Sequence, residues 1–174
     1  MQDDEVPQNA TEASEQGAPG VNVSVPNAVY KIHSNLDNSM IVDMSLTESS
    51  ASTHNVKLYS NSSATESTWK FYSIQVTRDL SMYLITNGRN NLALGKSTYY
   101  EDEENAIASR NDWRSSQLWL LKDAGGGSVY LENQWASDVL DVRGGSTSNN
   151  TNIIVYPYGG SSNQRFKLAY VRDL

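Results

Sequence analysis

The chain contains no cysteine and only two histidines among its 174 residues. The lack of cysteine excludes a disulfide framework, a zinc–thiolate centre and a thiol nucleophile, and two histidines exclude a histidine-rich metal site. Charged residues make up only 19% of the chain, and its net charge of −7 has the wrong sign for binding a phosphate backbone. No apolar run approaches the roughly 20 residues that span a bilayer. We therefore expect no cofactor, no metal, no nucleic-acid partner and no membrane insertion.

The start of the chain differs in composition from the remainder. The first twenty residues hold five acidic side chains, no lysine or arginine, and almost no large apolar side chain. Such a segment buries too little apolar surface to offset the entropy that it loses on ordering. The sequence predicts a disordered acidic tail or linker over residues 1–25 and one domain over residues 26–174, within the usual size of about 100–200 residues for a domain.

Short apolar stretches alternate with clusters of Asn, Ser and Gly through the rest of the chain. Stretches of three to six residues with alternating polarity and turn formers at both ends are typical of β-strands. No segment shows a convincing helical period. The sequence predicts an all-β fold of about twelve short strands, at residues 29–32, 40–42, 56–58, 69–71, 83–85, 91–94, 105–109, 118–120, 129–131, 140–142, 153–155 and 166–168.

Three anchors recur along the chain at nearly constant spacing. Large aromatic residues close three similar phrases at Trp69, Trp119 and Phe166, which are 50 and 47 residues apart. Repetition with a period of this length indicates a repeated structural unit. A unit of about four strands cannot bury its apolar face alone, whereas three units can close a barrel without exposed strand edges. The pattern predicts a β-trefoil of three pseudo-repeats. The other anchors are residues 42–44, 92–94 and 140–142, and residues 55–59, 105–109 and 152–156.

These anchors resemble those of the ricin B-type lectins, also called ricin-type carbohydrate-binding modules, over roughly residues 27–170. A lobe of that family ends in a Q-x-W phrase, and its sugar site begins at an aspartate in a phrase like L-D-V. The third repeat matches best, through residues 140–144, 153–156 and 163–166. A glutamine that the family often has two residues before the site aromatic is replaced by Ile154. The resemblance implies a carbohydrate-binding β-trefoil without catalytic activity.

The resemblance implies a sugar site in the third repeat. Asp141 would accept hydrogen bonds from two adjacent hydroxyls, and Tyr156 would stack on the apolar face of the sugar ring. Asn163 would supply an amide, which can both donate and accept, and Gln164 would brace Asp141 or bind a hydroxyl. The alternative interpretation is that Asp141 stabilises a turn and Tyr156 is a packed strand residue.

The first repeat keeps part of the same pattern. Asp43 and Tyr59 match the acid and the ring, but Glu66 and Ser67 stand where the third repeat has its two amides. An ionised glutamate cannot donate a hydrogen bond, so this site is altered. It could still bind with Lys57 as a donor, or it could be a retained scaffold whose site has decayed.

The second repeat departs further. Register with the other two places Ala93 at the acid position and Ser109 at the ring position. Both essential groups are then missing, so we expect this repeat to be inactive toward such sugars. Trp113 lies near its end and could be an exposed platform or could pack against a hairpin. An acidic run over residues 101–104 is interpreted as a solvated hairpin tip.

Catalysis is not expected. A glycosidase needs two carboxyl groups that face each other across a cleft, and no nucleophile-elbow pattern surrounds any serine. The resemblance implies galactose or N-acetylgalactosamine-type glycans of a cell surface, glycoprotein or polysaccharide as partners, a secreted or cell-surface location, and other modules or subunits beside this one. The alternative function is a trefoil protease inhibitor or another protein-binding module.

Overall fold

The computed structural model describes residues 17–47, 52–98 and 104–174. In these ranges the chain forms twelve strands and four 3-10 helices, which confirms the predicted all-β class. No helix in the described residues is long and apolar enough to cross a membrane. The strands are β1 (Ala28–Ser34), β2 (Met40–Met44), β3 (Thr53–Ser60), β4 (Trp69–Thr77), β5 (Leu80–Asn87), β6 (Ala93–Lys96), β7 (Ala106–Ser109), β8 (Leu118–Gly125), β9 (Ser128–Asn133), β10 (Val139–Val142), β11 (Ile153–Tyr156) and β12 (Phe166–Asp173). The 3-10 helices are η1 (Thr65–Ser67), η3 (Ser115–Gln117), η4 (Arg143–Gly145) and η5 (Ser162–Gln164).

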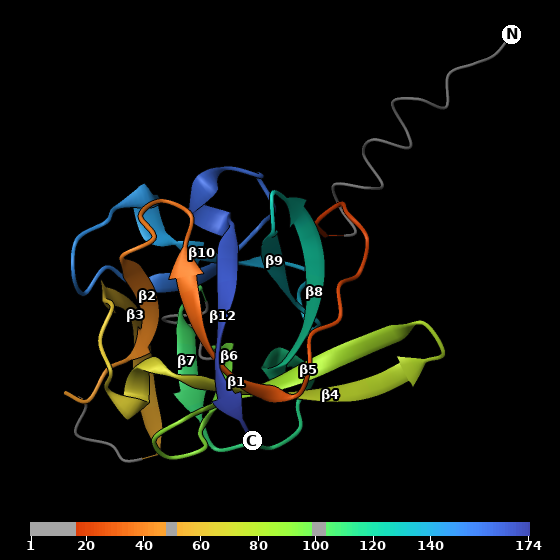
Figure 1. The fold of residues 1–174 in the computed structure, drawn as a ribbon, viewed down its shortest axis with the longest axis horizontal. Coiled ribbons are helices and arrows are strands. Elements are labelled where there is room, and N and C mark those ends of the chain that lie inside the picture. Colours follow the sequence, from red (N-terminus) through yellow and green to blue (C-terminus); the bar gives the residue numbers. More distant parts are fainter. Residues whose placement is uncertain (1–16, 48–51, 99–103) are drawn as a thin grey trace, which may run out of the picture.

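Six strands close into a ring, and three hairpins complete the fold (Figure 1). Antiparallel pairing runs from β1 through β4, β5, β8, β9 and β12 and back to β1. The three hairpins pair β2 with β3, β6 with β7, and β10 with β11. Since every ring strand has a neighbour on both sides, the barrel has no fully open edge strand. The fold is the predicted β-trefoil of three pseudo-repeats.

The three hairpins meet one another through their second strands. The backbone of Asn55 on β3 pairs with Ile107 on β7, and isolated bridges join Lys57 to Asn152 and Asn105 to Ile154. Three equivalent amides lie at this junction: Asn105 Nδ2 donates to Asn55 Oδ1 at 2.9 Å, and Asn55 Nδ2 donates to Asn152 Oδ1 at 2.8 Å. Each predicted middle strand therefore contacts the next repeat.

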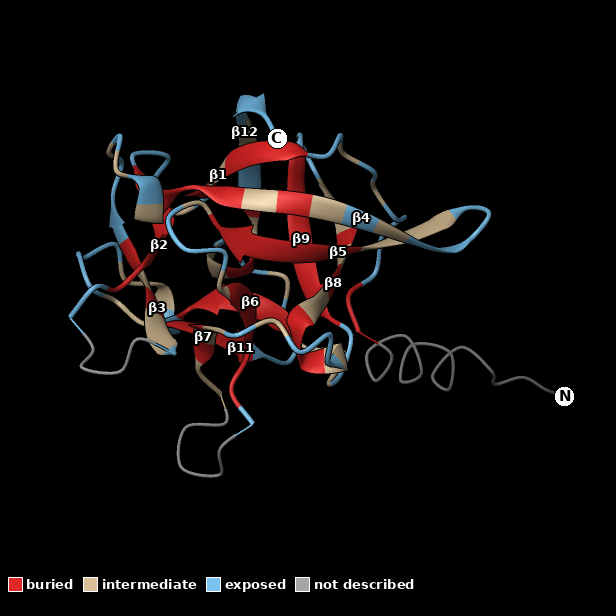
Figure 2. Cartoon of the chain, turned by 90° about the horizontal axis from the view of Figure 1, so that it is seen from below, coloured by how far each residue is buried: buried red, intermediate tan, exposed pale blue. Residues whose placement is uncertain are grey.

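The core holds one large aromatic residue from each repeat. Trp69, Trp119 and Phe166 begin or lie near the start of the strand that follows each 3-10 turn, and all three are fully buried. Figure 2 shows the buried strands gathered around this interior, whereas the tip of the β4–β5 hairpin is exposed. The two indoles also donate hydrogen bonds: Trp69 Nε1 donates to the Val42 carbonyl at 2.9 Å, and Trp119 Nε1 donates to the Leu94 carbonyl at 2.9 Å.

Residues 17–25 differ from the disordered tail expected from composition. Ala18 is buried, its N–H donates to Glu132 Oε1 at 2.8 Å, and its carbonyl accepts from Lys122 Nζ at 3.0 Å. Backbone hydrogen bonds join Val23 to Leu121 and Val21 to Asp123, so the segment runs beside β8 (Figure 1). Composition misses this order because its source is contact with distant residues: backbone pairing with β8, the ion pair between Lys122 and Glu132, and packing of Val23 and Val25 against the core. The rest of the expected tail, residues 1–16, lies outside the described residues.

Replacing Trp119 tests the shared core. Trp119→Ala leaves a cavity in the barrel and is expected to lower the free energy of unfolding by about 3–5 kcal/mol. Trp119→Phe keeps an aromatic ring, as Phe166 does in the third repeat, but removes the N–H that satisfies the Leu94 carbonyl, so its cost is expected at about 1–3 kcal/mol. Urea denaturation monitored by circular dichroism measures both. Equal effects would contradict a core role for the ring.

Candidate functional site

Each repeat has a candidate site where its hairpin meets a 3-10 turn. The turns η1, η3 and η5 end in Ser67, Gln117 and Gln164, and all three side chains are buried. A 3-10 turn just before the core aromatic leaves its last side chain directed back at the first strand of the hairpin. In the first and third repeats that side chain donates to an aspartate, Asp43 or Asp141.

The third repeat brings together all four residues predicted for it. Alternation along β10 and β11 places Leu140, Val142, Ile153 and Val155 in the core. Asp141 and Tyr156 therefore lie on the opposite face of the hairpin, because Asp141 pairs with Ile154 and side chains two residues apart share a face. Asp141 is only 4% exposed, whereas Tyr156 is 47% exposed.

Two amides hold the Asp141 carboxylate. Asn163 Nδ2 donates to Oδ1 at 2.8 Å, and Gln164 Nε2 donates to Oδ2 at 2.9 Å. The orientation of Gln164 is determined on its other side, where Oε1 accepts from the N–H groups of Gly159 and Gly160 at 2.8 and 2.9 Å. A carboxylate offers about four acceptor positions, so two remain for further donors. Burial raises the pKa of Asp141, the two amide hydrogen bonds lower it, and the net shift is upward.

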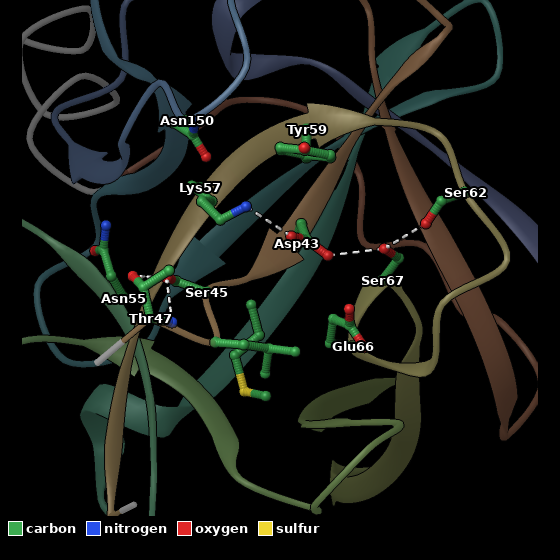
Figure 3. A pocket seen from close by; sticks show the side chains of 12 residues that line it. Asp43, Ser45, Thr47, Asn55, Lys57, Tyr59, Ser62, Glu66, Ser67 and Asn150 are labelled. Carbon is green, nitrogen blue, oxygen red and sulfur yellow. Dashed lines mark hydrogen bonds and ion pairs between the residues drawn. The ribbon is translucent and has the colours of Figure 1, made fainter. Parts of the chain in front are cut away.

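The first repeat forms a pocket of about 610 Å³ that contains the predicted acid and ring (Figure 3). Ser67 Oγ donates to Asp43 Oδ1 at 2.7 Å, and Lys57 Nζ donates to Asp43 Oδ2 at 2.9 Å. Tyr59 is 39% exposed at the pocket wall. Glu66 also lines the pocket. Both oxygens of Asp43 thus have partners from within its own repeat.

Lys57 contacts both anchors of this pocket at once. Its ammonium lies 2.9 Å from the Asp43 carboxylate and 4.1 Å from the centroid of the Tyr59 ring. Figure 3 shows its side chain reaching across from the strand that carries the ring toward the acid. The corresponding position opposite Asp141 is Ile154, which has no charge. The side chain of Lys57 therefore occupies space that stays free of a cation in the third repeat.

In the second repeat the residue at the acid position is Gly95, not Ala93. The carbonyl that accepts from the indole belongs to Val42 in the first repeat and to Leu94 in the second, so the residue after each carbonyl is equivalent. The stretch from Gly95 to Ser109 is shorter than the stretch from Asp43 to Tyr59 in the first repeat. Counting back from Trp119 by the spacing between Asp43 and Trp69 therefore gives the wrong residue. The structure thus has Gly95 at the acid position and Ser109 at the ring position of this repeat.

The second repeat still has a pocket, of about 450 Å³, with different chemistry. A Cβ added at Gly95 would lie 2.8 Å from the Ser116 carbonyl oxygen and 3.0 Å from Gln117 Cγ, so an aspartate does not fit there. Gln117 instead accepts from the Asp112 N–H and donates to Ser109 Oγ and the Arg110 carbonyl. The pocket is lined by Lys96, Arg110, Asp112 and Arg114 among neutral polar side chains.

Other candidate residues have structural partners or lie outside the described chain. His33 and His54 each place Nδ1 within 2.8 Å of a backbone carbonyl oxygen, of Asn38 and Ser45 respectively. Within the described ranges, no three His, Asp or Glu side chains gather into a group that could hold a metal ion. Of the acidic run over residues 101–104, only Glu104 is described. Trp113 is 60% exposed.

Sequence reasoning missed contacts between repeats. Asn150, from the third repeat, lines the pocket of the first, and its backbone N–H donates to the Leu58 carbonyl at 2.8 Å. The arginines around Asp112 were also missed. Comparing the repeats finds residues that the repeats share, and it does not find new residues that one repeat has in place of the shared ones. A cluster of basic residues just before the second Q-x-W phrase was the one signal available.

Comparison with known proteins gives one matching family and several similar folds. The model of the ricin-type beta-trefoil lectin domain-like family matches residues 65–156 and 115–172. The designed three-fold symmetric protein ThreeFoil has a TM-score of 0.71 at 24% identity, covering 82% of this chain and 99% of its own. The Rhizoctonia solani agglutinin has a TM-score of 0.72 at 17% identity, covering 88% and 100%. The earthworm R-type lectin C-half, in complex with GalNAc, has a TM-score of 0.62 at 16% identity, covering 84% and 100%. No curated protein sequence matches the chain.

Titration of Asp141 tests the environment of the third-repeat carboxylate. Because its pKa is raised in the folded state, the folded protein binds this proton more tightly than the unfolded chain. As the pH falls through the raised pKa of folded Asp141 toward the ordinary aspartate pKa of 3.8, Asp141 is protonated first in the folded state. This protonation therefore increases the free energy of unfolding over that pH range. The carboxyl ¹³C shift, followed by NMR against pH, is expected to report a midpoint above that of Asp37, whose pKa is lowered by hydrogen bonds from Ser39. The reverse order would contradict the burial argument.

Proposed function

The chain belongs to the ricin-type beta-trefoil lectin domain-like family, and from this premise we propose that it is a lectin domain that binds galactose or N-acetylgalactosamine-type glycans through shallow sites on its lobes. The observation that carries the proposal is the third-lobe pair, a preorganised Asp141 carboxylate on the same hairpin face as an exposed Tyr156. Family membership and this pair support carbohydrate as the ligand class.

The third-lobe geometry suits a sugar with two adjacent hydroxyls and an apolar face. The two free acceptor positions of Asp141 can take two hydroxyl protons, and charge-assisted hydrogen bonds of this kind are stronger than neutral ones. Tyr156 offers a ring for the C–H face of the sugar, which is how lectin-type pockets combine apolar and polar contacts. Asn163 braces Asp141 through its side-chain amide. Galactose, with its 3- and 4-hydroxyls beside an apolar face, is the proposed ligand, and GalNAc is bound by the similar earthworm lectin.

The first lobe is proposed as a weaker site. A sugar that uses Asp43 and Tyr59 must displace the Lys57 ammonium from at least one of its two contacts. Breaking a partly buried ion pair costs free energy that the sugar has to offset, whereas no cation stands opposite Asp141. The second lobe has neither anchor and is proposed to be inactive toward neutral galactosides.

Binding without catalysis is the proposed mode of action. In the first lobe, Lys57 and Ser67 engage Asp43 while Arg89 pairs with Glu66 at 3.4 Å, so both acids have protein partners. In the third lobe, two amides hold the Asp141 carboxylate. A shallow site of this kind has a Kd of roughly 0.1–10 mM for a monosaccharide, and useful avidity comes from several sites on one glycan surface. We propose a secreted or cell-surface location and glycoprotein or polysaccharide partners, with other modules or subunits attached.

Substitution of the third-lobe pair tests the function. Asp141→Ala and Tyr156→Ala are each expected to lower retention on immobilised galactose at least tenfold, because each removes one of the two anchors. Tyr156→Phe keeps the ring and is expected to retain most binding. Isothermal titration with lactose measures the same effect in solution.

The controls separate loss of binding from loss of fold. Tyr170→Ala removes another exposed tyrosine, on β12, and is expected to bind like the unaltered protein. Thermal unfolding of each variant confirms that the barrel is intact. Unchanged glycan binding by the Asp141→Ala, Tyr156→Ala double variant would remove the site assignment. Absence of binding to any glycan on an array would favour the protein-binding alternative, for which the protruding β4–β5 hairpin is the candidate contact (Figure 2).

Substitution of Lys57 tests the ranking of the lobes. Lys57→Met keeps most of the length of the side chain but removes the cation from between Asp43 and Tyr59. We expect the first-lobe affinity for lactose to rise several-fold, seen as amide shifts of Ser62 and Ser67 at lower lactose concentration in NMR titrations. Lys70→Met, on β4, removes a lysine whose ammonium donates to Asn91 in an exposed hydrogen bond; it is the matched control and leaves the first lobe unchanged. Weaker first-lobe binding in Lys57→Met would instead make Lys57 a donor to the sugar.

A further inference from the structure

We propose that the pocket of the second lobe binds a sugar residue that carries a carboxylate, as uronic acids and sialic acids do. The inference extends the proposed function to a different ligand class at a lobe that lacks the acid and the ring of the other two. It rests on the proposed function only for the sugar part of the ligand. The anion-binding part rests on the residues of this pocket.

The pocket is cationic in a protein that is acidic overall. Its lining has three cationic side chains, Lys96, Arg110 and Arg114, and one acidic side chain, Asp112. Lys96 is also close enough to Asp138 to interact with its charge, so the two arginines carry most of the argument. The whole chain has a net charge of −7, which disfavours general adhesion to polyanions. A local positive pocket on such a protein favours one anionic group that reaches into it.

Both arginines lie within ion-pair distance of the Asp112 carboxylate. Arg110 Nε donates to Asp112 Oδ1 at 3.1 Å, and Arg114 Nη2 lies 3.7 Å from Asp112 Oδ2. Gln117 fixes the same segment by accepting from the Asp112 N–H at 2.9 Å. A guanidinium has five N–H donors, so each arginine keeps several donors for a second carboxylate. Planar pairing of guanidinium with carboxylate is the geometry in which arginine binds most strongly.

The remaining groups of the pocket favour a ligand that accepts hydrogen bonds over a neutral galactoside. Gly95 removes the carboxylate that would accept sugar hydroxyls, and the space beside it is closed by Ser116 and Gln117. Ser109 stands where the other lobes have a tyrosine. The pocket therefore presents mainly donors, and a ligand that matches it must contribute the negative charge itself.

Trp113 is an exposed aromatic residue in the chain segment that forms part of the pocket wall, although it is not itself a lining residue. It stands between Asp112 and Arg114, which both line the pocket, and its side chain is 60% exposed. Its backbone has a φ of 58°, a left-handed conformation that is unfavourable for a bulky residue. The N–H of Trp113 donates to Asn111 Oδ1 at 3.0 Å, which stabilises this turn. An exposed indole held in a strained turn suits stacking on a sugar ring.

A matched pair of sugars tests the proposal. Methyl β-glucuronide and methyl β-glucoside differ only in a carboxylate against a hydroxymethyl group. In NMR titrations of the unaltered protein, we expect the glucuronide, or the methyl α-glycoside of N-acetylneuraminic acid, to shift the amides of Arg110, Asp112 and Gln117 with at least tenfold higher affinity than the glucoside. The two acidic sugars distinguish a uronic from a sialic acid ligand, and either result supports the proposal.

Variants locate the binding and separate it from the third-lobe site. The Arg110→Ala, Arg114→Ala double variant is expected to lose at least tenfold in affinity for the acidic sugar while its lactose binding is unchanged. Both arginine side chains are largely exposed, so the fold is expected to persist. Arg78→Ala, at the tip of the β4–β5 hairpin, removes one surface charge and is expected to change neither.

Three results would overturn the inference: affinities for both acidic sugars no higher than that for the glucoside, unchanged acidic-sugar binding in the double variant, or the same shifts from sodium acetate at equal concentration. The last would mean that the pocket takes any small anion. Failure of the galactoside function would appear separately, as lactose binding that is absent or insensitive to Asp141→Ala. The two proposals can therefore fail independently.

Discussion

Closure of three short units around one pseudo-threefold axis is the constraint on which the rest of the structure depends. No four-stranded unit can bury its own apolar face, and the buried aromatics Trp69, Trp119 and Phe166 supply the shared interior. The amide contacts among Asn55, Asn105 and Asn152 tie the three hairpins together at the axis. Because the core side of each hairpin strand is committed to this interior, the alternate residues must face outward. This is why an aspartate and a tyrosine reach the surface at fixed places in the repeat.

The same scaffold carries three different chemistries. In the third lobe two amides hold Asp141 and leave acceptor positions open. In the first lobe a lysine replaces an apolar neighbour and contacts both anchors. In the second lobe a glycine removes the acid, and two arginines surround Asp112 instead. Each difference comes from a few side chains on the same repeated fold, which is the way such a fold can acquire several ligand classes.

The arrangement also favours recognition of extended glycans over single sugars. One shallow site gives weak binding, but sites on separate lobes of one rigid barrel are held at fixed separations, so a second contact is made at high effective concentration. A third lobe that takes a galactoside and a second lobe that takes an acidic sugar would together select glycans that contain both. Selection of this kind rests on spacing as much as on affinity.

The sequence by itself determined the all-β class and the three repeats, because alternation and repetition are local patterns that the backbone has to follow. It also predicted the four third-lobe residues that are proposed here as a sugar site. It also predicted Asp43 and Tyr59 as a pair on one hairpin face. Only the tertiary structure decided what depends on contacts between distant residues. Lys57 lies between Asp43 and Tyr59 because strand register brings its ammonium there. Gly95, and not Ala93, takes the acid position because the hairpin of the second repeat is shorter. Residues 17–25 are ordered because a distant ion pair and the β8 backbone hold them, which no local composition can reveal.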